Sequence, residues 1–161
     1  NDYAVSKLAM EYLAKTYMDR LGIVITRPFN YTGVGQSSRF LIPKIVEHFR
    51  SKASSIKLGN LHVERDYSDV RDVSRYYFAL AETQPTGQTL NLCSGTTYSI
   101  SAILDVAFSK TGQRPEIVSE PSLIRDNEVH RLCGDSDLLK KNAATKATYR
   151  LHDTLDWMLS T

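Results

Sequence analysis

The spacing of hydrophobic and polar residues predicts an alternating series of helices and strands. Residues 3–20 have helical spacing, with Asp2 as the predicted N-cap and Gly22 directly after the helix. A continuous apolar run at 23–25 predicts a buried parallel strand, which ends at the segment 27–30. Further helices are predicted at 39–50, 69–82 (N-cap Asp69), 99–112 (N-cap Ser99), 136–141 and 151–159, and strands at 56–58, 63–67, 89–93 and 115–118.

Strands that alternate with helices are typical of an α/β fold built on a parallel sheet. A length of 161 residues fits one domain, so we expect residues 1–161 to form a single unit. The composition, 42% hydrophobic and 24% charged, is that of a soluble globular protein, and a net charge of +2 indicates no nucleic-acid-binding surface. No apolar run reaches about 18 residues, the length of a membrane span, so we expect no membrane insertion.

The cysteines and histidines do not indicate a metal site. Cys93 and Cys133 lack metal-ligand spacing and are predicted to be a buried, reduced pair, which suits a cytoplasmic protein. The four histidines are scattered, and none forms a pair at metal-ligand spacing. We therefore predict a cytoplasmic protein without a bound metal.

The run at residues 1–7 contains the first candidates for chemistry. Tyr3 and Lys7 are four residues apart in a predicted helix, which brings the phenol and the ammonium to one face. The ammonium favours the phenolate form, which suits acid–base catalysis near neutral pH. The same spacing occurs on ordinary helices with a solvated lysine, so the interpretation depends on the segments downstream.

Three downstream segments contain residues that are suited to binding a ligand. Pro28 and Asn30 lie at the carboxyl end of the first predicted strand, where open α/β sheets bind ligands. Gly59 and Asn60 form a predicted turn whose backbone can approach a planar base closely. Arg65, on the strand that follows, has forked donors that match a diphosphate.

Together these segments resemble the extended short-chain dehydrogenase/reductases, in the NAD-dependent epimerase/dehydratase branch that acts on nucleotide sugars. The runs 57–61, 64–67 and 125–129 are most similar to GDP-mannose 4,6-dehydratases and GDP-4-keto-6-deoxymannose reductases. The resemblance implies the C-terminal part of a Rossmann-like parallel sheet plus a small α/β substrate-binding lobe. It covers nearly the whole chain but only about half of such an enzyme, so we expect the N-terminal dinucleotide-binding half to be absent.

The resemblance also implies roles for the residues near the sugar and the cofactor. Tyr3 would act as general acid or base on the sugar, and Lys7 would orient the nicotinamide ribose. The backbone at Pro28 would touch the nicotinamide, and Asn30 would hydrogen-bond the nucleotide sugar. Lys44 would face the diphosphate or the base, or would be solvated like an ordinary helix lysine.

The remaining implied roles concern the nucleotide. Guanine is expected near Gly59 and Asn60, and a phosphate is expected near Arg65. Arg125 would contact the diphosphate, and the Glu128 carboxylate would accept hydrogen bonds from the ribose hydroxyls.

We therefore expect the C-terminal portion of an NAD- or NADP-dependent oxidoreductase that reduces the 4-keto group of a GDP-6-deoxy-4-keto-hexose. Dehydration of GDP-mannose, or another nucleotide-sugar epimerase or dehydratase reaction, is one alternative, and a non-catalytic nucleotide-binding module is another. The isolated chain is expected to be inactive. By analogy with the family, the helix at residues 3–20 could form a homodimer interface.

Overall fold

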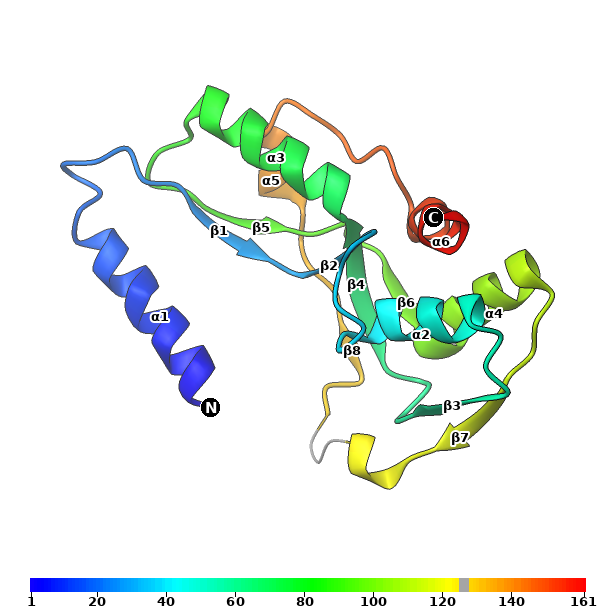
Figure 1. Cartoon of the computed structure of the whole chain (residues 1–161). Helices are drawn as coiled ribbons and strands as arrows, with labels where there is room; N and C mark the ends of the chain where they lie inside the picture. The colour runs from blue at the N-terminus through cyan, green and yellow to red at the C-terminus, as the bar shows by residue number, and fades with distance from the viewer. Residues whose placement is uncertain (125–127) are drawn as a thin grey trace.

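The protein, seen in a computed structural model, is described at residues 1–124 and 128–161, and Figure 1 shows its elements. The helices are α1 (Asp2–Lys15), α2 (Leu41–Arg50), α3 (Val70–Thr83), α4 (Ile100–Thr111), the 3-10 turn η1 (Pro121–Leu123), α5 (Asp137–Asn142) and α6 (Leu151–Ser160). The strands are β1 (Ile25–Pro28), β2 (Asn30–Thr32), β3 (Ser55–Leu58), β4 (Glu64–Asp69), β5 (Thr89–Leu92), β6 (Thr97–Ser99), β7 (Glu116–Ser119) and β8 (Arg131–Leu132). Within this described part of the chain, no helix has the length and apolarity needed to cross a membrane.

The predicted α/β fold with parallel strand pairing is confirmed. Parallel pairs join β1 to β5, β2 to β4, β3 to β7 and β4 to β8, whereas β4 and β6 are antiparallel. Strand β4 therefore has partners on both edges. Its residue Asp66 also accepts hydrogen bonds from the loop that follows β5 and from the loop that precedes α5. This central place of β4 matters for the site, because Arg65 and Tyr67 lie on it.

The larger core lies among α2, α4 and α6 with β3 and β7, a unit that we name the α2–α4–α6 lobe (Figure 1). Ile45 and Phe49 of α2, Ile103 of α4 and Leu155 of α6 are at most 1% exposed. The Phe49 ring lies 5.5 Å from the Phe108 ring. Burial of each such side chain contributes about 1.5–3 kcal/mol, so the lobe has a hydrophobic core of its own.

A smaller core lies where α3 and α5 cover one face of the β1–β5 pair (Figure 1). Its buried residues are Val73, Tyr76, Leu80, Leu90, Leu92, Leu139 and Ala143. In Figure 1, α1 lies on the other side of this pair of strands. The two faces of the pair therefore differ, since one is covered by the packed helices α3 and α5 and the other faces α1, none of whose residues is buried.

The N-cap predictions for α3 and α4 are confirmed. The Asp69 carboxylate accepts a hydrogen bond from the Arg71 N–H at 2.8 Å, and the Ser99 hydroxyl accepts one from the Ala102 N–H at 3.1 Å. Burial disfavours the ionised form of Asp69, but hydrogen bonds from Arg71 and Thr154 outweigh it and hold the pKa of this carboxyl below its usual range. Asp69 is thus a structural cap, as expected.

Helix α1 differs from its prediction at both ends. Its N-cap is Asn1, whose side chain accepts a hydrogen bond from the Ala4 N–H at 2.9 Å, whereas Asp2 is already helical. The helix ends at Lys15 rather than at residue 20, because the next amides donate to carbonyls three residues back and tighten the chain into turns. No residue of α1 is buried.

The first strand begins later in the chain than predicted. Strand β1 covers Ile25–Pro28, so it ends within the predicted segment 27–30 but does not start at residue 23, because its ladder with β5 begins at the pair Ile25 and Thr89. Asn30 lies on β2, a strand that the hydrophobic pattern does not reveal. The pattern also misses β6 and β8, which have only 3 and 2 residues and are too short to show a period.

The two cysteines are free, but only one is buried. Cys93 is buried, which raises the pKa of its thiol to about 12 and keeps it protonated. Cys133 is exposed, because it directly follows the exposed strand β8, so the predicted buried pair is wrong for this residue. Over residues 1–124 and 128–161, no cluster of three or more His, Cys, Asp or Glu side chains could hold a metal ion.

Candidate functional site

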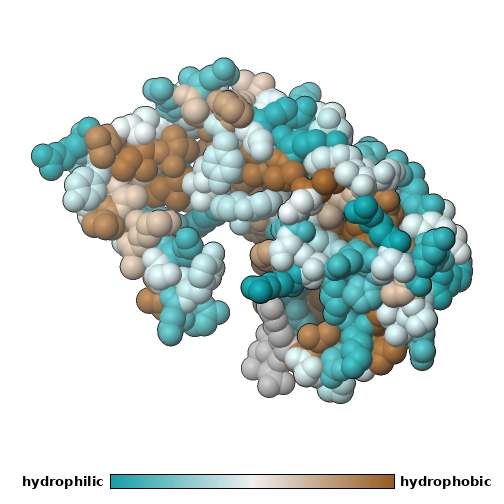
Figure 2. Space-filling view, viewed as in Figure 1, coloured by the Kyte–Doolittle hydropathy of each residue, from teal (hydrophilic) through white to brown (hydrophobic). Residues whose placement is uncertain are grey.

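Two adjoining pockets bring most of the predicted site residues together. The Gly59 pocket has a volume of about 320 Å³, and its polar lining comprises Asn30, Arg39, Lys44, Asn60, Arg65 and Glu128. The Tyr3 pocket has a volume of about 620 Å³, and Tyr3, Pro28, Asn30 and Arg39 are among its lining residues. Both pockets are lined by Asn30, Arg39, Leu41 and Tyr67. The space-filling view shows the molecule deeply hollowed between α1 and the α2–α4–α6 lobe (Figure 2).

Tyr3 and Lys7 share one face of α1, as their spacing predicts. The Lys7 ammonium lies 5.5 Å from the centre of the Tyr3 ring, and the Tyr3 side chain is 71% exposed. Tyr3 lines its pocket together with Pro28, which ends β1. A phenol that is open to a pocket and close to a cation can exchange a proton with a bound ligand.

Helix α1 is attached to β1 by an ion pair rather than by packing. The Arg27 guanidinium donates two hydrogen bonds to the Glu11 carboxylate, at 2.9 and 2.6 Å, and Lys15 lies 3.1 Å from the same carboxylate. These hydrogen bonds, first from Arg27 and then from Lys15, lower the pKa of Glu11 to about 2. Since the Arg27 side chain is 53% exposed, water screens this pair and its contribution to stability is small.

Asn30 is held at the junction of the two pockets. Its amide nitrogen donates a hydrogen bond to the Asp66 carbonyl at 3.1 Å, which joins β2 to β4 through a side chain. This bond uses one of the two N–H donors of the amide, and the amide oxygen is an acceptor that a ligand could use. The Asn30 side chain thus has an amide oxygen that can accept a hydrogen bond, and the residue lines both pockets, so its predicted ligand contact stays a prediction with a defined acceptor.

Gly59 allows the end of β3 and the turn η1 to pack closely against each other in the pocket wall. A Cβ atom at this position would lie 2.6 Å from the Leu123 carbonyl oxygen, so only glycine fits between β3 and η1. The Asn60 side chain accepts a hydrogen bond from the His62 N–H at 3.0 Å, which fixes the turn that follows. The turn was predicted as a base-binding site, and the structure places it in the pocket wall.

Arg65 and Glu128, predicted to bind a phosphate and a ribose, form an ion pair with each other. The Arg65 Nη2 atom lies 3.0 Å from a Glu128 carboxylate oxygen, and both side chains are 19% exposed. The Arg65 Nη1 atom also donates to the carbonyls of Glu64 and Val129, each at 2.8 Å. The guanidinium therefore fixes the position of Glu128 in the pocket and is itself held by protein groups.

Lys44 and Arg125 complete the set of predicted site residues. Lys44 lines the Gly59 pocket, but its ammonium donates a hydrogen bond to the Lys57 carbonyl at 2.6 Å. This contact fastens α2 to β3 and occupies one of the three ammonium donors. Arg125 lies outside the described residues, so its predicted diphosphate contact stays a prediction.

Asp66 supports the site in a way that the sequence analysis missed. This fully buried carboxylate accepts hydrogen bonds from the N–H groups of Ser94, Gly95 and Gly134 at 2.9, 2.9 and 3.2 Å, and from the Ser94 hydroxyl at 2.6 Å. It thereby ties β4 to two loops. Strand periodicity could have indicated this role, because both neighbours of Asp66 line the Gly59 pocket and its own side chain must point away from them.

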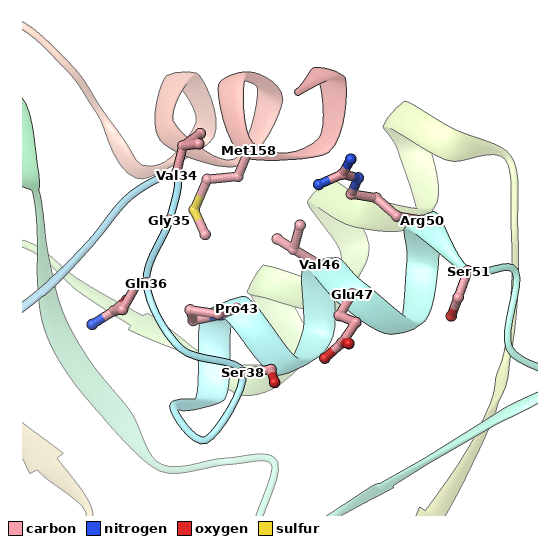
Figure 3. Close-up of a pocket in the computed structure, with 10 residues that line it drawn as sticks. All are labelled: Val34, Gly35, Gln36, Ser38, Pro43, Val46, Glu47, Arg50, Ser51 and Met158. Atoms are coloured by element: carbon pink, nitrogen blue, oxygen red, sulfur yellow. The ribbon is translucent and has the colours of Figure 1, made fainter.

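Another pocket, of about 560 Å³, lies between the loop at 34–38, α2 and α6 (Figure 3). Figure 3 shows Val34, Pro43, Val46 and Met158 on its apolar side and Arg50 at its rim. None of the residues predicted to bind a ligand or to act in catalysis lines it. This pocket is therefore not the candidate site. Its residues provide control positions for substitutions in the site, because the α2 residues that line it differ from those that line the Gly59 pocket.

The structure places a tyrosine and a lysine on a helix beside the carboxyl end of a parallel strand, next to a polar pocket. Its fold is that of the Rossmann-type short-chain dehydrogenase/reductases of the epimerase/dehydratase branch. Comparison with known families gives the particular assignment, because residues 1–158 match the model of the family described as GDP-mannose 4,6 dehydratase. The chain belongs to this family, which confirms the resemblance found in the sequence.

Individual relatives agree with the family. The chain is 33% identical to a GDP-6-deoxy-D-talose 4-dehydrogenase of Aggregatibacter actinomycetemcomitans, over 86% of this chain and 47% of that protein. It is 31% identical to a GDP-6-deoxy-D-mannose reductase of Pseudomonas aeruginosa, over 98% of this chain and 50% of the relative. The structure of RMD from Pseudomonas aeruginosa complexed with NADPH superposes with a TM-score of 0.91 at 29% identity, over 99% of this chain and 55% of that one. The chain thus spans about half the length of the relatives that it matches.

Proposed function

We propose that the chain is part of an NAD(P)-dependent nucleotide-sugar oxidoreductase that reduces the 4-keto group of a GDP-6-deoxy-4-keto-hexose. The observation that carries the proposal is the shared wall of the two pockets, with Tyr3 in one and the Arg65–Glu128 pair in the other. Two relatives support this substrate class, since one is named as a GDP-6-deoxy-sugar 4-dehydrogenase and the other as a GDP-6-deoxy-sugar reductase. The first name also supports C4 of the sugar as the carbon that reacts.

In this proposal the nucleotide sugar lies across both pockets. The guanosine end occupies the Gly59 pocket, where the Glu128 carboxylate accepts hydrogen bonds from the ribose hydroxyls. The turn at Gly59 and Asn60 lies against the base. The sugar occupies the Tyr3 pocket, and Asn30, which lines both pockets, binds the part of the substrate between them.

Tyr3 is the proposed acid. During reduction its phenol donates a proton to the oxygen at C4, which becomes a hydroxyl, and the Lys7 ammonium stabilises the phenolate that remains. In the reverse direction the phenolate removes the same proton. A nicotinamide cofactor, when bound, supplies the hydride.

The residues near Tyr3 suit the nicotinamide end of such a cofactor. Pro28 and Tyr3 line one pocket, and Lys7, one helical turn after Tyr3, would hydrogen-bond a hydroxyl of the nicotinamide ribose. NADPH accompanies the RMD structure that this chain resembles, which supports NADP(H) as the first cofactor to test. The dinucleotide-binding half is proposed to belong to a longer protein, so this chain alone should not turn over substrate.

Dehydration of GDP-mannose is the second candidate, because it is the reaction named in the description of the matching family. The two reactions are separated by giving the full-length protein GDP-mannose with NADP, and, in a second vessel, a GDP-4-keto-6-deoxy-hexose with NADPH. We expect NADPH consumption only in the second vessel. Release of the 4-keto-6-deoxy product from GDP-mannose would instead establish a dehydratase, and no reaction in either vessel, with GDP bound, would favour a non-catalytic module.

The proposal extends to assembly and location. Val5, Leu8, Tyr12 and Leu13 of α1 are each at least 50% exposed, and we propose that α1 pairs with its copy in a homodimer. Sedimentation of the full-length protein should show a dimer that Leu8→Glu disrupts, and a wild-type monomer would refute this assembly.

A cytoplasmic location is also proposed, since reducing conditions there keep free thiols such as that of Cys133 unpaired.

A further inference from the structure

Among the described residues, Arg39 is the basic residue that lines both pockets, and no motif in the sequence singles it out. It precedes α2, lines the Gly59 pocket and the Tyr3 pocket, and is exposed. Its backbone N–H donates a hydrogen bond to the Ser37 hydroxyl at 3.4 Å, a contact that does not involve the guanidinium. The residue therefore lies where a ligand would pass from one pocket to the other.

The other described cations of the Gly59 pocket are already engaged by protein groups. The Lys44 ammonium donates to the Lys57 carbonyl at 2.6 Å. The Arg65 guanidinium pairs with Glu128 at 3.0 Å and also donates to two backbone carbonyls. The charge of Arg65 is thus largely balanced by a carboxylate before any ligand arrives.

Arg39 differs from these two residues in its surroundings. None of the ion pairs formed among residues 1–124 and 128–161 includes Arg39. Its five N–H donors form a planar fork that matches the oxygens of a phosphate. A diphosphate that links a base in one pocket to a sugar in the other would carry its negative charge to the wall that both pockets share.

We propose that Arg39 binds the diphosphate of the nucleotide sugar, and that Arg65 chiefly positions Glu128. The inference rests on the proposed function, since it assumes a nucleotide sugar that spans both pockets. It assigns the main diphosphate contact to a residue before α2 instead of to Arg65 on β4, where the sequence predicts a phosphate. The substrate class that follows is a nucleoside diphosphate ester rather than a neutral sugar or a nucleoside.

The test is calorimetric titration of the full-length protein with GDP and with guanosine, which lacks phosphate. Arg39→Gln should weaken GDP binding by about 10- to 100-fold, the range of one or two charge-assisted hydrogen bonds, and leave guanosine binding unchanged. Arg39→Lys should restore part of the loss. Raising the salt concentration should narrow the difference between wild type and Arg39→Gln, because salt screens exposed charges.

Arg50→Gln is the matched control. Arg50 is also an exposed arginine of the α2 region, but it lines the pocket of Figure 3 and lies outside both site pockets. Its substitution should leave the GDP affinity at the wild-type value. An equal loss in Arg39→Gln and Arg50→Gln would show a general effect of charge and overturn the assignment.

The remaining outcomes separate this inference from the proposed function. If wild type binds GDP and Arg39→Gln binds it equally well, Arg39 does not contact the diphosphate, and the proposed function still stands. If Arg39→Gln loses GDP and guanosine in the same proportion, the residue shapes the pocket and the diphosphate assignment is wrong. If wild type binds neither ligand, the proposed function itself fails.

Discussion

The two regions that meet at the site are held in place by different forces. The α2–α4–α6 lobe contains Phe49 and Leu155, both fully buried, and the Gly59 pocket is built on this core. Helix α1, with Tyr3 and Lys7, buries no residue and is attached to β1 through the Glu11–Arg27 ion pair. Figure 2 shows the hollow that separates them.

This difference indicates that nucleotide binding and catalysis depend on separately stabilised parts of the molecule. The residues proposed to bind the nucleotide are positioned by the hydrophobic core and by buried hydrogen bonds within the chain. The residues proposed to act in catalysis stand on an exposed helix, where substitution disturbs little packing. Changes at Tyr3 and Lys7 should therefore alter turnover without altering stability, whereas changes in the lobe core should alter stability first.

The largest effect is expected for Tyr3→Phe in the full-length protein. Loss of the proposed acid should lower kcat by about 10²- to 10⁴-fold, the usual contribution of a general acid or base. The Kd for GDP and the unfolding midpoint should stay at the wild-type values, because the Tyr3 side chain is 71% exposed in this chain. Steady-state kinetics measures kcat, and calorimetry measures the Kd for GDP and the unfolding midpoint. A Tyr3→Phe variant with the wild-type kcat would show that Tyr3 is not the general acid.

A comparison of Phe49→Ala with Leu8→Ala in this chain tests the packing difference directly. Phe49 is 0% exposed in the lobe core, so its truncation should lower the free energy of unfolding by about 3–5 kcal/mol. Leu8 is 50% exposed on α1, and its truncation should cost about 0.5 kcal/mol or less. Urea unfolding measures both values, and similar losses would contradict the contrast between the regions.

Asp66→Asn should have an intermediate effect on stability. The amide replaces one acceptor oxygen with a donor that faces the N–H donors of Ser94, Gly95 or Gly134, so at least one buried group loses its partner. We expect a loss of about 1–3 kcal/mol in the free energy of unfolding. Asp105→Asn, at an exposed position of α4, is the control and should be neutral. Equal stability of the two variants would show that Asp66 does not hold β4 to its loops.

The smallest expected effect concerns the attachment of α1. Because the pKa of Glu11 is lowered from 4.5 to about 2, the ion pair stabilises the fold above pH 4.5 and this contribution is lost as the pH falls towards about 2. Arg27→Gln should raise the pKa of Glu11 part of the way back to 4.5, since Lys15 still contacts the carboxylate. An NMR titration of the Glu11 carboxyl measures this change, and an unaltered pKa would contradict the attachment through Arg27.

The sequence predicted those parts of the site that short local patterns encode. The spacing of Tyr3 and Lys7 places both on one helix face whatever the rest of the chain does. Gly59 was predicted as a turn, and its close approach to Leu123 gives the physical reason for a glycine there. Arg65 and Glu128 were both predicted at the nucleotide site, although their mutual ion pair was not.

Features that depend on contacts between distant segments could not be predicted in this way. Arg39 lines two pockets because β2, α2 and β4 lie next to one another beside it, and no short sequence motif predicts that arrangement. Asp66 accepts hydrogen bonds from residues 28 to 68 positions away in the chain. The end of α1 was also misplaced, because the hydrophobic spacing continues beyond Lys15 after the hydrogen bonding has changed to turns.

Hydrogen exchange of this chain, with and without GDP, tests the central claim most directly. We predict that GDP slows the exchange of amides at residues 56–67, around the Gly59 pocket, and leaves the exchange of the α1 amides unchanged. No GDP protection at residues 56–67, or GDP protection confined to residues 34–38 and 47–51 around the pocket of Figure 3, would contradict this prediction.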